Sequence, residues 1–307
     1  MSPRRYRFVQ VDVFTDQLFG GNQLAVFLDP EGLTDQEMQA IAQEMNFAET
    51  TFVLPSTTAA AAARVRIFTP GRELPFAGHP TVGTTWVLAN QHRLPAPSGG
   101  GKLALEEGIG LVPVRLEGDP DAPSVVWMSH VDARFGPPVA SRRLVAEALG
   151  LVESDLLPDQ PICSGTTGVS FLYVPLRTPQ IVDRVRANLS ALPDDVFDGE
   201  RSGVFVFAPD PGRGAASVYS RMFAGETLGV PEDAATGSAS GPLGAYIAER
   251  GVLHVHDPIE IVSLQGKRMG RPSTIRIRLD LRDGHATNIA VGGGVVPVLE
   301  GELTLRD

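Results

Sequence analysis

The sequence predicts an α+β fold in which two pseudo-symmetric β-sheet halves each wrap around one central helix. Three observations lead to this prediction. The chain has 307 residues, which is more than a single hydrophobic core usually supports. Short strand-like runs outnumber helical stretches along it. A motif in the first half of the chain also recurs in the second half.

The elements of the first half follow from local patterns. Residues 8–14 partly alternate between apolar and polar side chains, which predicts a strand, and a Gly-rich turn leads to a second strand at 24–28. The segment from Thr34 to Glu37 has the spacing of a capping box, and an amphipathic helix follows it. Asn46 is expected to end that helix, because asparagine tolerates the left-handed conformation. Strands at 52–54 and 64–68 follow, with a connection at 59–63.

The repeat consists of an Arg-X-Phe segment, a glutamate, and a glycine that leads into a helix. The matching residues are Arg66, Phe68, Glu73 and Gly78 in the first half, and Arg221, Phe223, Glu232 and Gly237 in the second. The two helices are predicted at 81–91 and 239–249. Each leads to a strand, a glycine and a further strand, which lies at 112–116 or 274–279. We therefore predict halves at 1–118 and 119–289, with the C-terminal strand near 290–307 joining the first half.

Composition and charge exclude several classes of protein. The net charge of −10 argues against a nucleic-acid binder, which needs clustered Lys and Arg. The basic cluster at Arg4, Arg5 and Arg7 is expected to be a solvated terminus. Cys163 is the single cysteine, so no intramolecular disulfide can form, and we expect a small buried side chain there. No apolar run approaches a membrane span and no signal peptide is evident, which together indicate the cytoplasm.

The two glycine-led helices suggest a binding site. A helix N-terminus carries free N–H donors and a partial positive charge, so it attracts anions. Glycine at Gly78 and Gly237 lets backbone and ligand approach closely. If the halves pack face to face, both helix starts can point into one cleft and hold a small carboxylate.

Glu49 is the first candidate for chemistry. It follows an amphipathic helix and has Phe47, Ala48 and Phe52 around it, which would raise its pKa toward neutrality and suit a group that takes and returns a proton. On local context alone, a solvent-facing glutamate at a strand entrance is the commoner arrangement.

The other candidates lie at the helix starts. Asp233, Thr236 and Ser238 can cap a helix, and the same groups can bind a substrate there. His79 lies beside Gly78, where a surface or capping role is the structural alternative.

No metal or cofactor is predicted. The histidines lack metal-ligand spacing with carboxylate support; His254 and His256 would share one face of a strand but have no third ligand. Neither a P-loop nor a dinucleotide fingerprint occurs, and no flavin or pyridoxal signature is found.

Several stretches resemble the PhzF-like family of phenazine biosynthesis, which has the diaminopimelate-epimerase fold. They are residues 19–27 (FGGNQLAVF), 44–53 (EMNFAETTFV), 73–81 (ELPFAGHPT), 232–239 (EDAATGSA) and 270–273 (GRPS). They occur in family order across most of the chain. The resemblance implies two curved sheets, each around a helix, with the active site between the halves. It also implies a cofactor-free homodimeric isomerase, like the archetype that isomerises trans-2,3-dihydro-3-hydroxyanthranilate.

The resemblance also implies roles for individual residues. The catalytic glutamate of the family falls on Glu49, and its substrate-contacting residues fall on His79, Asp233 and Ser238. The backbone around Gly78 and Gly237 would hold the substrate carboxylate. Thr236 stands where related racemases place a thiol, so racemisation by paired thiols is excluded here.

Two alternatives to an isomerase remain open. A lyase would use Glu49 to remove a proton and expel a β-hydroxyl group. A non-catalytic binder of small acids would keep the cleft without turnover.

Overall fold

The computed structural model describes residues 3–94, 103–197, 202–214, 216–224 and 231–306. The chain forms two compact units. The first unit contains residues 1–129 and 292–307, and the second contains residues 130–291. The predicted boundary at residue 118 falls inside a β-hairpin, whose second strand keeps the chain in the first unit as far as Ser129.

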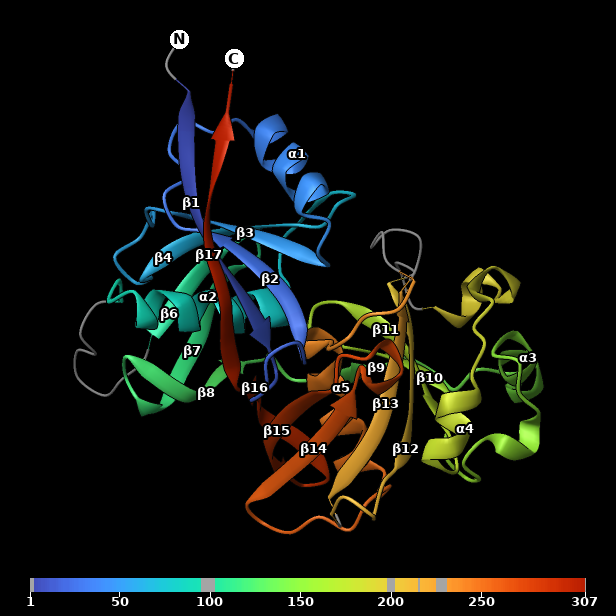
Figure 1. Cartoon of the computed structure of the whole chain (residues 1–307). Coiled ribbons are helices and arrows are strands. Elements are labelled where there is room, and N and C mark those ends of the chain that lie inside the picture. Colours follow the sequence, from blue (N-terminus) through green and yellow to red (C-terminus); the bar gives the residue numbers. More distant parts are fainter. Residues whose placement is uncertain (1–2, 95–102, 198–201, 215, 225–230, 307) are drawn as a thin grey trace. The chain divides into compact units, whose positions relative to one another are not determined.

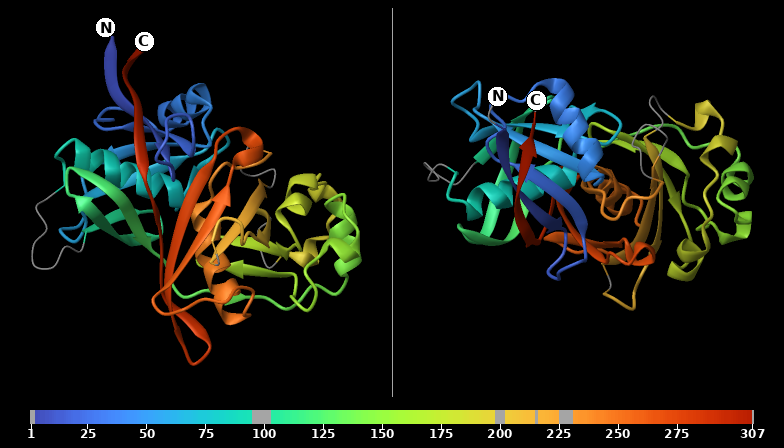
Figure 2. Two further views of the ribbon diagram at one scale, coloured as in Figure 1. Left: turned by 60° about the horizontal axis from the view of Figure 1, so that its bottom comes forward. Right: turned by 45° about the horizontal axis from the view of Figure 1, so that its top comes forward.

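The first unit is a mixed sheet around one helix (Figure 1). Antiparallel pairs join β17 to β1, β1 to β2, β3 to β4, β6 to β7 and β7 to β8, while β2–β3 and β4–β6 are parallel. The two ends of the chain are therefore neighbours, as Figure 2 also shows. The strands are β1 (Arg4–Val13), β2 (Asn22–Phe27), β3 (Glu49–Leu54), β4 (Ala63–Phe68), β5 (Glu73–Leu74), β6 (Leu103–Glu107), β7 (Gly110–Asp119), β8 (Ala122–Ser129) and β17 (Val295–Leu305).

Helix α2 (Gly78–Asn90) is the centre of this unit. Every residue from Gly78 to Ala89 is buried, and this includes the polar His79, Thr81, Thr84 and Thr85. It contacts β1, β2 and β17 as well as β8 at the other end of the strand order. The sheet therefore curves around the helix. Helix α1 (Asp35–Met45) lies against β3 and β4 and joins the parallel pair β2–β3.

The second unit repeats this arrangement. Its strands pair in the order β9, β10, β11, β12, β13, β14, β15, with β11–β12 and β13–β14 parallel and the other pairs antiparallel. The strands are β9 (Arg134–Phe135), β10 (Cys163–Thr166), β11 (Ser170–Pro175), β12 (Gly203–Pro209), β13 (Ser217–Ala224), β14 (Ile259–Gln265) and β15 (Ser273–Arg282); β16 (His285–Gly293) crosses the unit boundary. Its helices are α3 (Arg142–Ala148), α4 (Pro179–Arg184) and α5 (Gly237–Glu249).

The internal repeat corresponds to a repeat of topology. From β1 to β7 and from β10 to β15, the same sequence of antiparallel and parallel pairs occurs. Helices α2 and α5 occupy the same place in it, each linking two parallel strands. Helix α5 is buried along most of its length and contacts β10, β11 and β15.

A bidentate ion pair recurs at matching positions of the repeat. Arg66 binds both carboxylate oxygens of Glu73 at 2.7 Å, and Arg221 binds both oxygens of Glu232 at 2.8 Å. Each guanidinium also lies over a phenylalanine ring two residues later, at 5.1 Å and 4.6 Å from the ring centroid. The Arg-X-Phe and Glu residues of the motif thus act together. In each copy, their ion pair connects the segment before the central helix to the sheet.

Several predicted elements are confirmed and others are corrected. Thr34 and Glu37 form the capping box of α1, and Asn46 ends it with a φ of 52°. Cys163 is buried. The central helices begin at Gly78 and Gly237, earlier than predicted, because Pro80 fits the first turn of a helix and the small residues after Gly237 pack closely.

The N-terminal arginines have exposed side chains, as expected for a solvated terminus, but they also form part of a strand. They lie in β1, which pairs with β17. Arg5 and Arg7 form ion pairs with Glu302 and Glu300 on β17, and Arg4 pairs with Glu37. Within the described residues, no helix is both long enough and apolar enough to cross a membrane.

Candidate active site

Glu49 is placed by the junction between α1 and β3. The left-handed Asn46 turns the chain out of α1, and Glu49 is the first residue of β3, opposite Leu24 on the parallel strand β2. Its side chain is only 14% exposed. The sequence alone favoured a glutamate facing the solvent, so the tertiary structure corrects that local expectation.

His79 lies beside Glu49. Its side chain is 4% exposed, and its Nε2 lies 3.4 Å from Oε2 of Glu49. A buried hydrogen bond of 2.9 Å between the hydroxyls of Thr51 on β3 and Thr84 on α2 holds these two elements together. The second residue of α2 therefore meets the first residue of β3.

Asn22 completes this cluster. Its Nδ2 lies 3.1 Å from Nδ1 of His79. This contact holds the imidazole ring of His79 beside the Glu49 carboxylate. The preceding Gly21 has a φ of 61°, and a Cβ there would lie 2.3 Å from the carbonyl oxygen of Val13, so only glycine can deliver Asn22 to this position.

The imidazole of His79 is neutral. Burial lowers its pKa to about 3, although a backbone hydrogen bond with Gln23 opposes the shift. The cluster therefore places an uncharged imidazole beside a shielded carboxylate. An uncharged neighbour does not stabilise the ionised form of the carboxyl group as a cation would.

The second unit contains another buried polar cluster at the start of α5. Thr236 donates its hydroxyl to Oδ2 of Asp233 at 2.6 Å. Gln265, at the end of β14, accepts from the backbone N–H of Thr236 at 3.1 Å. Its amide nitrogen also lies 2.9 Å from both the Thr236 hydroxyl and the Asp233 carbonyl. Ser238 is half-buried one residue beyond Gly237.

Both central helices begin without a side-chain cap. In the described part of the chain, neither Ala77 before α2 nor Thr236 before α5 caps its helix with a side-chain hydrogen bond. The predicted capping role of Thr236 is therefore wrong, because its hydroxyl binds Asp233 instead. A helix start that lacks such a cap is suited to binding an external anion.

The turn that carries Gln265 also depends on a glycine. Gly266 has a φ of 74°, and a Cβ there would lie 2.2 Å from the carbonyl oxygen of Arg271 and 2.6 Å from that of Ala234. A larger residue would push this turn away from the segment of Asp233. Sequence reasoning missed both Asn22 and Gln265 as members of these clusters; their positions next to Gly21 and Gly266 are the signals that could have indicated them.

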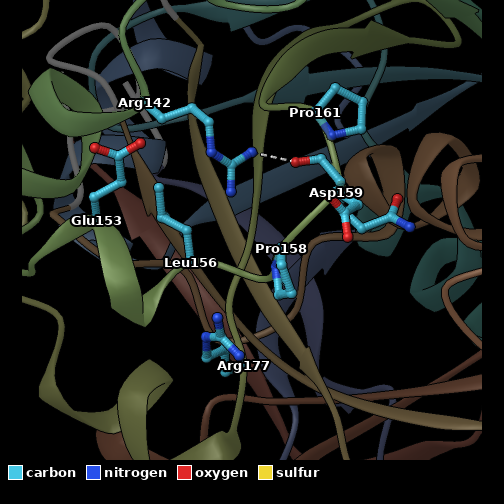
Figure 3. Close-up of a pocket in the computed structure, with 8 residues that line it drawn as sticks. Arg142, Glu153, Leu156, Pro158, Asp159, Pro161 and Arg177 are labelled. Atoms are coloured by element: carbon cyan, nitrogen blue, oxygen red, sulfur yellow. Dashed lines mark hydrogen bonds between the residues drawn. The ribbon is translucent and has the colours of Figure 1, made fainter.

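Other polar features lie apart from these clusters. A recess of about 510 Å³ in the second unit is lined by Arg142, Glu153 and Arg177, among others (Figure 3). Arg142 binds the carbonyls of Leu157 and Gln160 there, so its guanidinium holds a loop together. The rings of His254 and His256 meet edge to face with 4.7 Å between their centroids, but the two residues precede β14 and do not lie on a strand. Among the described residues, no group of three His, Cys, Asp or Glu is arranged to hold a metal ion.

Comparisons with known proteins agree with this architecture. A family model described as phenazine biosynthesis-like protein matches residues 11–301. The chain is 33% identical to trans-2,3-dihydro-3-hydroxyanthranilate isomerase of Pseudomonas fluorescens, over 98% of this chain and 100% of that protein. A crystal structure of a PhzF-family protein from Bacillus anthracis superposes with a TM-score of 0.85 at 27% identity, covering 98% and 99% of the two chains. A hydroxyproline epimerase from Agrobacterium vitis shares the fold, with a TM-score of 0.66 at 14% identity over 99% and 94% of the chains.

The fold class is thus that of the diaminopimelate-epimerase-like α+β proteins, as predicted. The chain belongs to the phenazine biosynthesis-like, or PhzF, family. It is an enzyme of the isomerase class.

Proposed function

We propose that the enzyme moves a proton between two carbon atoms of a small carboxylate-bearing substrate, with Glu49 as the group that removes and returns the proton. The observation that carries this proposal is the 3.4 Å approach of the Glu49 carboxylate to His79 in surroundings that largely exclude water. The substrate is trans-2,3-dihydro-3-hydroxyanthranilate or a similar cyclic acid, by analogy with the Pseudomonas fluorescens relative.

The chemistry follows from the charges in the cluster. A cationic imidazole would stabilise the ionised carboxylate and weaken it as a base. The neutral His79 lies 3.4 Å from the carboxylate without bringing such a charge, and Asn22 fixes the imidazole in turn. After Glu49 takes a proton from one carbon, the same carboxylic acid delivers a proton to another.

Asp233, Thr236, Gly237 and Ser238 are proposed to bind the substrate as well. The hydroxyl of Thr236 fixes the carboxylate of Asp233, and this carboxylate is proposed to orient an amine or hydroxyl of the substrate. The backbone N–H groups around Gly78 and Gly237 are proposed to bind the carboxylate.

The test is turnover of trans-2,3-dihydro-3-hydroxyanthranilate in deuterated water, followed by NMR. We expect the wild type to place deuterium on a new carbon, and Glu49→Gln to lose activity by about 10³-fold or more, because general acid–base catalysis contributes roughly that much. Glu44→Gln, which changes an exposed carboxylate on α1, is the matched control and should behave as wild type. Undiminished activity of Glu49→Gln would contradict the assigned role. Release of water from the substrate would instead identify a lyase, and binding without exchange would identify a non-catalytic binder.

A further inference from the structure

A second buried carboxyl group lies in the first unit. Glu107, the last residue of β6, is 6% exposed. Its Oε1 lies 2.6 Å from the hydroxyl of Thr81, in the first turn of α2. Its Oε2 is buried and makes no hydrogen bond to any residue that the structure describes. The proposed chemistry does not use this group.

The hydrogen bonds around Thr81 require a proton on Glu107. The Thr81 hydroxyl lies 2.6 Å from Oε1 of Glu107 and 2.7 Å from the carbonyl oxygen of Ala77. A hydroxyl has one hydrogen to donate, and neither a carbonyl nor a carboxylate can donate in return. Both short contacts are satisfied only when Glu107 is a carboxylic acid that donates to Thr81, while Thr81 donates to Ala77.

The internal repeat supplies an independent comparison. Gln265 stands at the position of Glu107 in the second copy, directly before the matching glycine. Ser240 stands at the position of Thr81 and makes the same bond to the residue before its helix, at 2.9 Å from the Thr236 carbonyl. The neutral amide of Gln265 holds the start of α5. A neutral acid is the closest equivalent that glutamate can provide.

We propose that Glu107 is a positioning residue that, as a neutral carboxylic acid, fixes the start of α2 through Thr81 and Ala77 and leaves the helix N-terminus available to an anionic substrate. This inference rests on the proposed function of the same helix start. An ionised Glu107 would break the chain of hydrogen bonds and place a negative charge at the first turn of α2, where it competes with the substrate carboxylate.

The surroundings of Glu107 would not compensate the negative charge of its ionised form. The titratable and charged residues on its own strand and on the elements packed around it are Glu106 on β6, Arg64 and Arg66 on β4, Glu73 on β5, Arg115, Glu117 and Asp119 on β7, and His79 on α2. Within the described ranges, none of them makes a hydrogen bond or ion pair with Glu107. Burial raises the pKa of Glu107 to about 8.

The kinetic test compares KM for trans-2,3-dihydro-3-hydroxyanthranilate in the wild type, Glu107→Gln and Glu106→Gln. Above about pH 8, KM of the wild type should rise roughly tenfold per pH unit. Glu107→Gln should remove this rise, because an amide can take the place of the acid, whereas Glu106→Gln should retain it. Glu107→Ala should raise KM at every pH. A rise of equal slope in the wild type and Glu107→Gln would overturn the proposal.

A second measurement does not depend on turnover. The infrared spectrum of the wild type minus that of Glu107→Gln should contain the band of a protonated carboxyl group at about pH 6.5 and lose it at about pH 9.5. Absence of the band at the lower pH would overturn the proposal whatever the kinetics. If the band is present but the compound is not converted, the substrate assignment fails while the neutral acid is supported. Amide exchange at the start of α2, faster in Glu107→Ala and restored in Glu107→Gln, then tests the positioning role.

Discussion

At the scale of single residues, burial decides which groups carry charge. His79 in the first unit and His130 in the second are both buried, and burial lowers their pKa values to about 3 and about 4. His130 binds the hydroxyl of Thr167 at 2.7 Å, and its ring packs against Gly241, where a Cβ would lie 2.7 Å from Nδ1. The same physical effect that keeps His79 uncharged beside Glu49 thus makes both histidines sensitive to acid.

The first prediction concerns stability at acid pH. Between about pH 6.5 and about pH 4, His130 is protonated in the unfolded chain but remains neutral in the folded chain. The free energy of unfolding therefore falls as the pH is lowered through this range. The contribution of His130 is at most about 1.4 kcal/mol per pH unit. Urea unfolding across this range should give a shallower pH dependence for His130→Asn than for the wild type. His285→Asn, which changes an exposed histidine, is the control; an unchanged slope in His130→Asn would contradict the prediction.

At the scale of elements, the repeated Arg–Glu pair fastens the segment before each central helix to its sheet. The two copies differ in burial. The Arg221 and Glu232 side chains are 7% and 17% exposed, whereas those of Arg66 and Glu73 are 16% and 42% exposed. Arg221 also donates to the carbonyls of Val182 and Val185, whereas the second partner of Arg66 is the exposed carboxylate of Asp35.

The second prediction follows from that difference. Glu232→Gln leaves a buried guanidinium without its counter-charge and should lower the free energy of unfolding by about 3–5 kcal/mol. Glu73→Gln, its matched variant in the other copy, should cost about 1 kcal/mol or less, because Glu73 is exposed and Arg66 keeps a second carboxylate partner, Asp35, at 2.6 Å. Urea unfolding of both variants at neutral pH measures the two costs. Equal costs would show that burial does not set the strength of this pair.

At the scale of the whole molecule, the first unit is assembled from both ends of the chain. Strand β17 pairs with β1 from Leu305 opposite Arg4 to Val295 opposite Val13. The second unit is continuous in sequence and contains no part of β17. The last residues of the chain should therefore matter to one unit and not to the other.

A truncation tests this dependence. A chain that ends at Gly294 loses β17, which exposes the hydrogen-bonding edge of β1. Hydrogen exchange should accelerate in β1 to β4 while β10 to β13 stay protected. A chain that ends at Glu302 keeps most of the pairing and should resemble the full chain. Protection of β1 to β4 in the shorter chain would contradict the prediction.

The sequence by itself determined the features that depend on local spacing and on duplication. The capping box at Thr34, the turn at Asn46 and the repeated Arg, Phe and Glu residues were readable in the chain, and they correspond to matching strand orders in the two units. Local hydrogen bonding and hydrophobic periodicity are properties of neighbouring residues, so they do not require knowledge of distant ones.

Only the tertiary structure decided which polar groups meet and which of them carry charge. The contacts of His79 with Asn22 and of Thr81 with Glu107 join residues from separate elements, and Gln265 reaches Thr236 in the same way. The burial that shields Glu49 and keeps His79 and Glu107 neutral comes from sheets that curve around the central helices. No local pattern encodes that loss of solvent, because it is a property of the packed core.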